Sequence, residues 1–225
     1  NLSHSEDLLP QRYNNWSRTV FSNNWYYKPP EIDRASFTLY SDWTDRLSTK
    51  FKYTSYEMEE DDASYGDDLF PEMNITITDP VTGDRDNVFL GGDRYRGANL
   101  INVESEFLTF KADYNNDDHV YTVGFERDDS DVVNLFIARY NGEVRFRSFE
   151  DYKNGVWSRL RIHEPYAGHE AVGTMAADFE VEKTSMYIQD KWFVNDDLTV
   201  MFGLRYDAVA VSYTHLRAHD TPINL

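Results

Sequence analysis

The chain has 225 residues, and its 40 acidic side chains outnumber its 22 basic ones, which gives a formal net charge of -18. This charge disfavours binding to nucleic acid, because both partners would be anionic. The absence of cysteine excludes a disulfide framework and thiolate metal sites. No apolar run approaches the roughly 18 to 20 residues of a membrane helix, and an aromatic content of 16% argues against disorder.

Apolar and polar residues first alternate in two segments that begin at Ser36 and Leu47 and flank the acidic linker 42–46. Alternate side chains of a strand point to opposite faces, so each segment is predicted to be a strand with one apolar and one polar face. Asn and Asp suit tight turns because they tolerate left-handed backbone. The pair is therefore predicted to form a β-hairpin, whose polar face carries Lys50 and Lys52.

A second pair of alternating segments occupies residues 108–114 and 120–126. The linker between them, 115–119, reads Asn-Asn-Asp-Asp-His and again favours a tight turn. This pair is predicted to be the second hairpin. The charged residues on its polar face are Lys111, Asp113 and Glu126.

The third predicted hairpin joins residues 186–194 to residues 198–206 through the turn Asn195-Asp196-Asp197. Its alternation places Phe202 on the apolar face and Met201 on the polar face, which also carries Arg205 and Asp207. Asp190 fits this pattern poorly, because it falls on the apolar face, where a carboxylate would be unfavourable in lipid. Its closeness to the turn predicts a position at the level of the lipid headgroups.

Long segments, roughly 57–98 and 138–176, separate the three predicted hairpins and are expected to be loops. Short turns that alternate with long loops are typical of outer-membrane barrels, in which the turns are periplasmic and the loops extracellular. The sequence therefore predicts an all-β fold, an antiparallel transmembrane β-barrel segment of about six or seven strands, with outer-membrane lipid against its apolar faces. The alternative is a soluble extracellular β-sandwich that binds glycans, which also fits the alternation.

The third predicted hairpin resembles a late barrel hairpin of the TonB-dependent receptor family. The residues that carry the resemblance are Tyr187-Ile188-Gln189-Asp190-Lys191-Trp192 and Gly203-Leu204-Arg205-Tyr206-Asp207. Upstream, Tyr140-Asn141-Gly142 and Asp151-Tyr152 resemble the preceding loop of Oar-like receptors, a subgroup that carries a carboxypeptidase-regulatory-like domain. Residues 1–100 resemble the family only in their general sequence pattern.

The resemblance implies a 22-stranded barrel with a plug domain, which imports a bulky nutrient with energy relayed by the TonB system. We therefore expect residues 1–210 to be an internal fragment of such a barrel in the cell outer membrane. Its expected partners are the plug domain, the remaining barrel strands and, through the missing N-terminus, the TonB system. Residues 211–225 resemble a translated sequencing adapter and are set apart as a non-native tail.

The charged residues of the polar faces are expected to line the barrel interior, where they pair with one another, with the plug or with a substrate. Four aromatic residues of the long loops are candidates for contacting a ligand: Tyr65, Tyr95, Phe146 and Trp157. The two histidines of 163–170 do not have the spacing of a zinc protease, and the acidic run 57–68 matches no EF-hand loop. We predict no metal site, no cofactor and no enzyme activity.

Overall fold

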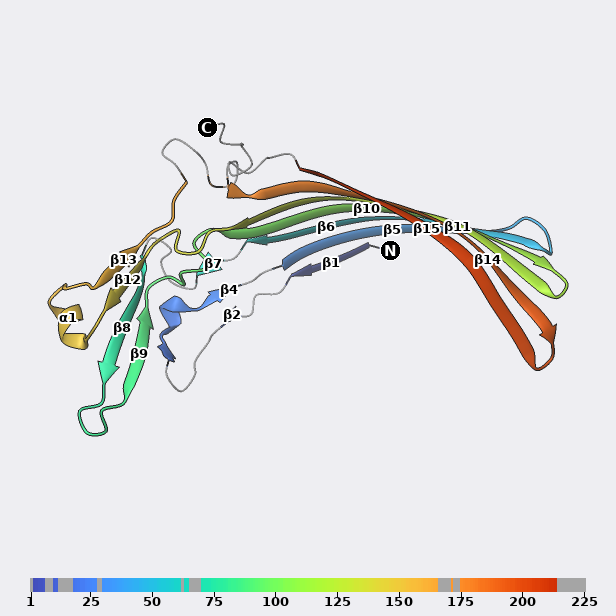
Figure 1. The fold of residues 1–225 in the computed structure, drawn as a ribbon. Coiled ribbons are helices and arrows are strands. Elements are labelled where there is room, and N and C mark those ends of the chain that lie inside the picture. Colours follow the sequence, from blue (N-terminus) through green and yellow to red (C-terminus); the bar gives the residue numbers. More distant parts are fainter. Residues whose placement is uncertain are drawn as a thin grey trace, which may run out of the picture.

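A computed structural model of the chain describes residues 2–6, 10–11, 18–27, 30–61, 63–64, 70–165, 171 and 175–213. Within these residues, antiparallel pairing builds a seven-stranded sheet, the long sheet, in the order β1-β5-β6-β10-β11-β14-β15 (Figure 1). Its strands are β1 (Leu2–Glu6), β5 (Pro30–Asp42), β6 (Leu47–Asp61), β10 (Asn99–Asn116), β11 (His119–Phe136), β14 (Ala177–Asn195) and β15 (Leu198–Tyr213). The predicted all-β, antiparallel fold of about six or seven strands is confirmed.

The three predicted hairpins are present as β5–β6, β10–β11 and β14–β15. Their short turns lie together at one end of the long sheet (Figure 1), where the Asn115 N–H donates to the Arg46 carbonyl at 2.8 Å. The strands extend further from the turns than the alternation predicted. The expected loop start at residue 57 is therefore wrong, because Glu57 still pairs with Glu104 within the sheet.

One face of the long sheet carries an apolar band close to the turns. Two neighbouring rows of cross-strand partners form its centre: Leu204, Ile188, Val123 and Ala112, then Tyr206, Met186, Phe125, Phe110, Phe51 and Leu39. In β14 the band runs from Asn195 to Thr184. At a rise of roughly 3.3 Å per residue and a tilt near 45°, this stretch spans about 25 Å, the height of the apolar band of a membrane barrel.

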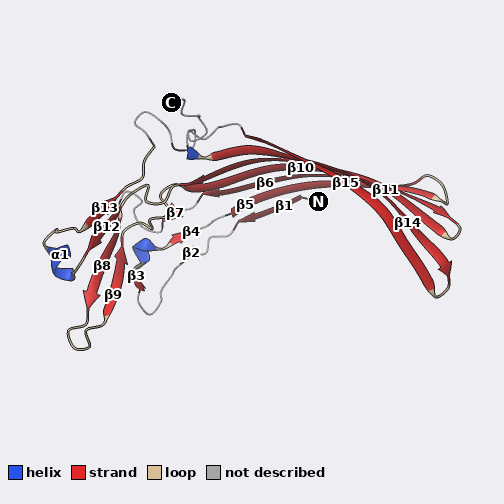
Figure 2. Ribbon diagram, viewed as in Figure 1, coloured by secondary structure: helices blue, strands red, loops and turns tan. Residues whose placement is uncertain are grey.

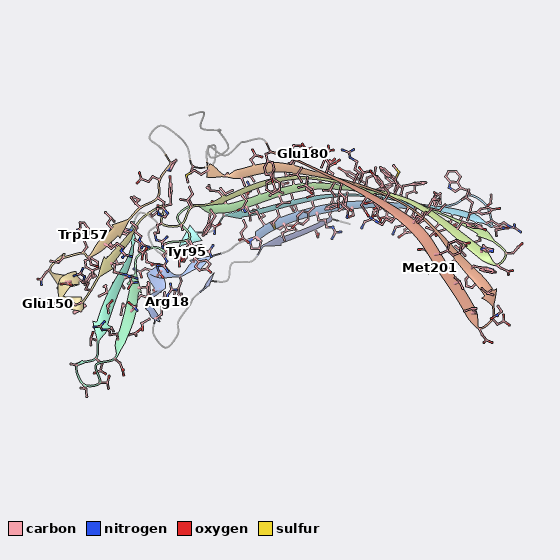
Figure 3. All side chains as sticks on the ribbon, in the orientation of Figure 1. Arg18, Tyr95, Glu150, Trp157, Glu180 and Met201 are labelled. Atoms are coloured by element: carbon pink, nitrogen blue, oxygen red, sulfur yellow. The ribbon has the colours of Figure 1, made fainter. Side chains whose placement is uncertain are left out.

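Beyond the apolar band, the same face becomes acidic. One row of cross-strand partners consists of carboxylates on five neighbouring strands: Asp33, Glu57, Glu104, Asp131 and Glu180. Figure 3 shows Glu180 on the convex side of the arched sheet. Like charges directly opposite each other repel, so this row requires water and counterions around it. The change from apolar to acidic rows therefore marks the end of the surface that lipid could cover.

The long sheet ends on both sides in an edge strand. Within the described residues, β15 pairs only with β14, and β1 only with β5. An edge strand presents a row of unpaired N–H and C=O groups, and lipid offers no water to satisfy them. The sheet therefore requires further strands at its edges to be stable within a membrane.

A second sheet lies at the end of the long sheet that is opposite the hairpin turns (Figures 1 and 2). Its order is β13-β12-β8-β9-β3. Its strands are β3 (Arg18–Val20), β8 (Glu72–Thr78), β9 (Arg85–Leu90), β12 (Glu143–Phe146) and β13 (Arg159–Arg161). Most of it comes from the two connections that were predicted to be loops. That part of the prediction is wrong, because short strands in these segments pair with each other.

The second sheet has a small apolar core and two short helical elements. Its buried apolar side chains are Val20, Ile75, Phe89 and Phe146. The helical elements are η1 (Ser22–Asn24) and α1 (Phe149–Lys153), and three minimal strands, β2 (Pro10–Gln11), β4 (Tyr26–Tyr27) and β7 (Ala63–Ser64), form a separate sheet. Among the described residues, no helix has the length and hydropathy needed to cross a membrane.

An arginine introduced on one face of β14 should lower stability much more than an arginine introduced on the other face. In the complete barrel, Ile188→Arg should lower stability by roughly 2–4 kcal/mol, because the arginine side chain would lie near the middle of the apolar band and face lipid. Gln189→Arg, on the other face, should be much better tolerated. Refolding titrations into lipid vesicles would measure both variants. A larger loss of stability for Gln189→Arg than for Ile188→Arg would show that the lipid-facing and interior faces are assigned the wrong way round.

Candidate functional site

All seven charged residues predicted for the polar faces lie on one face of the long sheet. They occupy three adjacent rows: Asp113 in the first, Lys50, Lys111 and Arg205 in the second, Lys52, Glu126 and Asp207 in the third. We call them the inner cluster. Figure 3 shows Met201, which shares their face, on the concave side of the sheet. The strand register thus gathers residues from β6, β10, β11 and β15 into one polar surface.

Arg205 is the centre of one half of the inner cluster. Its Nη2 lies 2.7 Å from Glu126 Oε2, and its Nε lies 3.0 Å from Asp207 Oδ1. Ser185 Oγ donates to the same Asp207 oxygen at 2.5 Å. Arg205 therefore links β15 to β11 across the intervening strand β14, and these charges are satisfied within the sheet.

The other half of the inner cluster is only partly paired. Lys111 Nζ lies 2.8 Å from Asp113 Oδ2, and Thr122 Oγ1 donates to Asp113 Oδ1 at 2.5 Å. Lys50 lies over the Tyr40 ring, with Nζ 5.6 Å from its centroid. Among the described residues, no carboxylate forms an ion pair with Lys50 or Lys52. These two lysines therefore remain available to a group from outside the segment.

Tyr187 is a member of this surface that sequence reasoning missed. It lies directly opposite Gly124, and a Cβ at Gly124 would come within 2.1 Å of the Tyr187 ring. The absent side chain thus gives the ring space to lie flat across β11. The Arg205 guanidinium lies 5.6 Å from the ring centroid. A glycine opposite an aromatic residue was the signal in the sequence, but it is visible only once the register is known.

Asp190, which fitted the apolar face poorly, has a partner there. Its Oδ2 lies 2.9 Å from His119 Nδ1, and the residue is only 8% exposed. The His119 ring stacks with Tyr121 at 5.5 Å and with Trp192 at 5.6 Å between centroids. The carboxylate is thus paired and covered by aromatic rings close to the turns, where Tyr and Trp suit a membrane interface.

The aromatic loop candidates occupy different environments. Tyr65 lies outside the described residues. Tyr95 stacks on Phe136 with ring centroids 6.2 Å apart. Phe146 is buried and meets Tyr152 edge-on, so it belongs to the core of the second sheet. Trp157 is 59% exposed, and Figure 3 labels it beside the second sheet.

Buried ion pairs hold the second sheet together. Arg94 Nη1 lies 3.2 Å from Glu143 Oε1 and 3.6 Å from Glu72 Oε1, and Arg139 Nε donates to Glu143 Oε2. The side chains of Glu72 and Glu143 are 0% and 4% exposed. Asn24 Nδ2 also donates to Glu72, at 3.3 Å. These contacts join β8 and β12 to the turn that follows β9, to the turn that precedes β12, and to η1.

Burial affects the two glutamates differently. It raises the pKa of Glu72 above its usual value, although Arg94 opposes the change. Burial would also raise the pKa of Glu143, but the Arg139 hydrogen bond and the Arg94 charge outweigh it and hold that pKa below its usual value. The stability that Glu143 contributes is therefore present at neutral pH and is lost as the pH falls through its lowered pKa.

Possible metal ligands are exposed. His4, Glu31 and Asp33 have ligand atoms within 4.8 Å of one another at the edge of the long sheet, and His4 Nδ1 lies 3.0 Å from Asp33 Oδ1. This exposed ion pair accounts for their closeness without a metal. Residues 166–170 and 65–69, which include parts of the histidine and acidic segments, lie outside the described residues.

Removal of the Glu143 charge should loosen the second sheet alone. Glu143→Gln leaves Arg139 without its buried anionic partner and leaves Arg94 with Glu72 alone, and the loss of one partner of a buried ion pair typically costs about 3–5 kcal/mol. Amides of β8 and β12 should then exchange hydrogen faster in the complete protein, whereas β10 and β11 should not change. Glu150→Gln, at an exposed position of α1, is the matched control. Unchanged exchange in β8 and β12 would contradict the assigned role.

Comparison with known proteins supports the fold. The chain matches no protein-family model and no curated protein. Among solved structures it is similar to the outer membrane transporter YddB from Escherichia coli, with a TM-score of 0.54 and 11% identity. The similarity covers 92% of this chain and 24% of that one. At this identity the likeness shows the fold alone: the chain has the fold of part of an outer-membrane transporter barrel.

Proposed function

We propose that the chain forms part of the wall of a TonB-dependent outer-membrane receptor that takes up a bulky nutrient. The observation that carries the proposal is the contrast between the two faces of one curved sheet. The convex face has an apolar band about 25 Å high, bounded by acidic rows. The concave face carries the inner cluster. A transporter wall requires lipid contact on one side and a polar passage on the other.

The soluble glycan-binding β-sandwich fits the structure less well. A sandwich buries the apolar face of each sheet against the other sheet. Here Leu204, Tyr206 and Phe202 are 79%, 67% and 58% exposed, and no second layer of the described residues covers the apolar band. Contact with lipid would cover such an exposed apolar face.

The proposal includes partners for each free surface. Outer-membrane lipid covers the convex face, and the remaining barrel strands pair with the edges at β1 and β15. A plug domain or the substrate meets Lys50 and Lys52 on the concave face. The TonB system acts through a segment outside this chain. Catalysis, a cofactor and nucleic acid have no part in this function.

Accessibility to reagents from outside the cell tests the proposed sidedness. The chain has no cysteine, so single cysteines introduced into the complete receptor report without background from this segment. Glu150→Cys in α1 should react with an impermeant thiol reagent on whole cells. Asp196→Cys, in a hairpin turn, should react only after the outer membrane is opened. The reverse pattern would overturn the topology.

Binding to TonB tests the energised part of the proposal separately. The complete receptor, purified in detergent, should be retained by the immobilised periplasmic domain of TonB. A receptor shortened by its N-terminal energy-coupling segment should pass through, because that segment supplies the contact. If the complete receptor also passes through, TonB-dependent uptake is excluded, while the barrel topology stands on the labelling result.

A further inference from the structure

The second sheet contains a groove with a volume of about 460 Å³. This volume lies within the range of roughly 300–1,000 Å³ that is typical of small-molecule sites. Its lining comes from four strands or their ends: Thr76, Thr78, Arg85, Arg145, Arg147, Ser158 and Arg159. We call it the arginine groove, because every charged side chain in this lining is an arginine.

The register of the second sheet forces like charges together in the groove. Arg145 on β12 lies directly opposite Arg159 on β13. Like charges at directly opposed positions destabilise a sheet. The Ser158 N–H and Oγ both donate to the Arg145 carbonyl, at 2.8 and 2.9 Å, and so hold the two strands together beside this pair. The fold therefore maintains the repulsion at this position.

The groove arginines lack acidic partners within the part of the chain that the structure describes. None of the four forms an ion pair there, although the chain has 40 acidic residues and only 22 basic ones. Three acids lie near Arg85 in sequence, but each accepts a hydrogen bond from another group. Asp79 Oδ1 accepts from the Val81 N–H at 2.7 Å, Asp84 Oδ2 from Thr82 Oγ1 at 2.9 Å, and Asp86 Oδ2 from Thr19 Oγ1 at 3.2 Å. Elsewhere on this sheet, by contrast, Arg94 is paired with Glu143.

We propose that the arginine groove binds a molecule that carries two or more phosphate groups. Guanidinium groups form bidentate hydrogen bonds with phosphate oxygens. Four positive charges balance two phosphates of about -1.5 to -2 each, and the hydroxyls of Thr76, Thr78 and Ser158 supply further donors. A bound anion would also remove the repulsion between Arg145 and Arg159.

This inference deepens the proposed function and rests on it for the exposure of the groove outside the cell. The phosphates can belong to a free solute or to the headgroup of a lipid, because both present the same chemistry. Binding itself does not depend on TonB or on uptake. A failure of the groove to bind phosphate would therefore leave the labelling and TonB results unaffected. Likewise, a failure of the labelling or TonB experiments would leave phosphate binding unaffected.

Calorimetric titration of the complete protein in detergent with inorganic tripolyphosphate tests the site. We expect saturable binding that weakens at higher salt, because charge drives it. Arg145→Gln combined with Arg159→Gln should weaken binding at least about tenfold, since two bidentate contacts are lost. The paired Arg→Lys variant should lose only part of the affinity. Arg46→Gln, in a turn at the opposite end of the long sheet, is the matched control and should bind like the unaltered protein.

Further titrations distinguish the source and the class of the ligand. Flotation with phosphatidylcholine vesicles that contain a bisphosphorylated lipid tests the headgroup source, and the same double variant should abolish it. Binding in either format that requires Arg145 and Arg159 supports the proposal. Absence of binding in both formats would overturn it, as would binding that the double variant retains. Equal affinity for citrate would overturn the preference for phosphate.

Discussion

Continuous backbone pairing between neighbouring strands is the interaction on which this structure depends. Within lipid no water is available to satisfy an N–H or C=O group, so every strand that crosses must be paired along its length. β10 and β11 meet this requirement from Asn99 to Asn116. Within the described residues β15 pairs only with β14, so in lipid the same requirement would call for a further strand at its other edge. Both faces of the sheet and the placement of the inner cluster follow from that pairing.

Much of the long sheet could be predicted from the sequence, because alternation and Asp-rich turns are local signals. The three hairpins needed nothing beyond residues close to one another in the chain. The second sheet could not be predicted in this way. It pairs Arg18–Val20 with part of β9, and β8 with β12, in parallel and across long stretches of chain. Its strands are short, and Glu72 and Glu143 are buried where a sequence pattern suggests an exposed loop.

The candidate site was predictable to a similar extent. Alternation placed the inner cluster on one face, but it could not show which charges neutralise one another. Arg205 reaches Glu126 across an intervening strand, and such a contact depends on the register of three strands. The partner of Asp190 was missed for the same reason, because His119 stands on a neighbouring strand. The arginine groove depends on the non-local pairing of β8 with β12.

The acidic rows beside the apolar band have a consequence for how the strands find their alignment. An alternating pattern excludes a slip by one residue, because that would exchange the faces of a strand, but it permits a slip by two. A slip of β11 by two residues toward the turns would keep its faces and carry Arg127 into the apolar band, between Phe110 and Met186, where Phe125 now lies. The boundary between apolar and charged rows thus disfavours a misalignment that alternation alone allows.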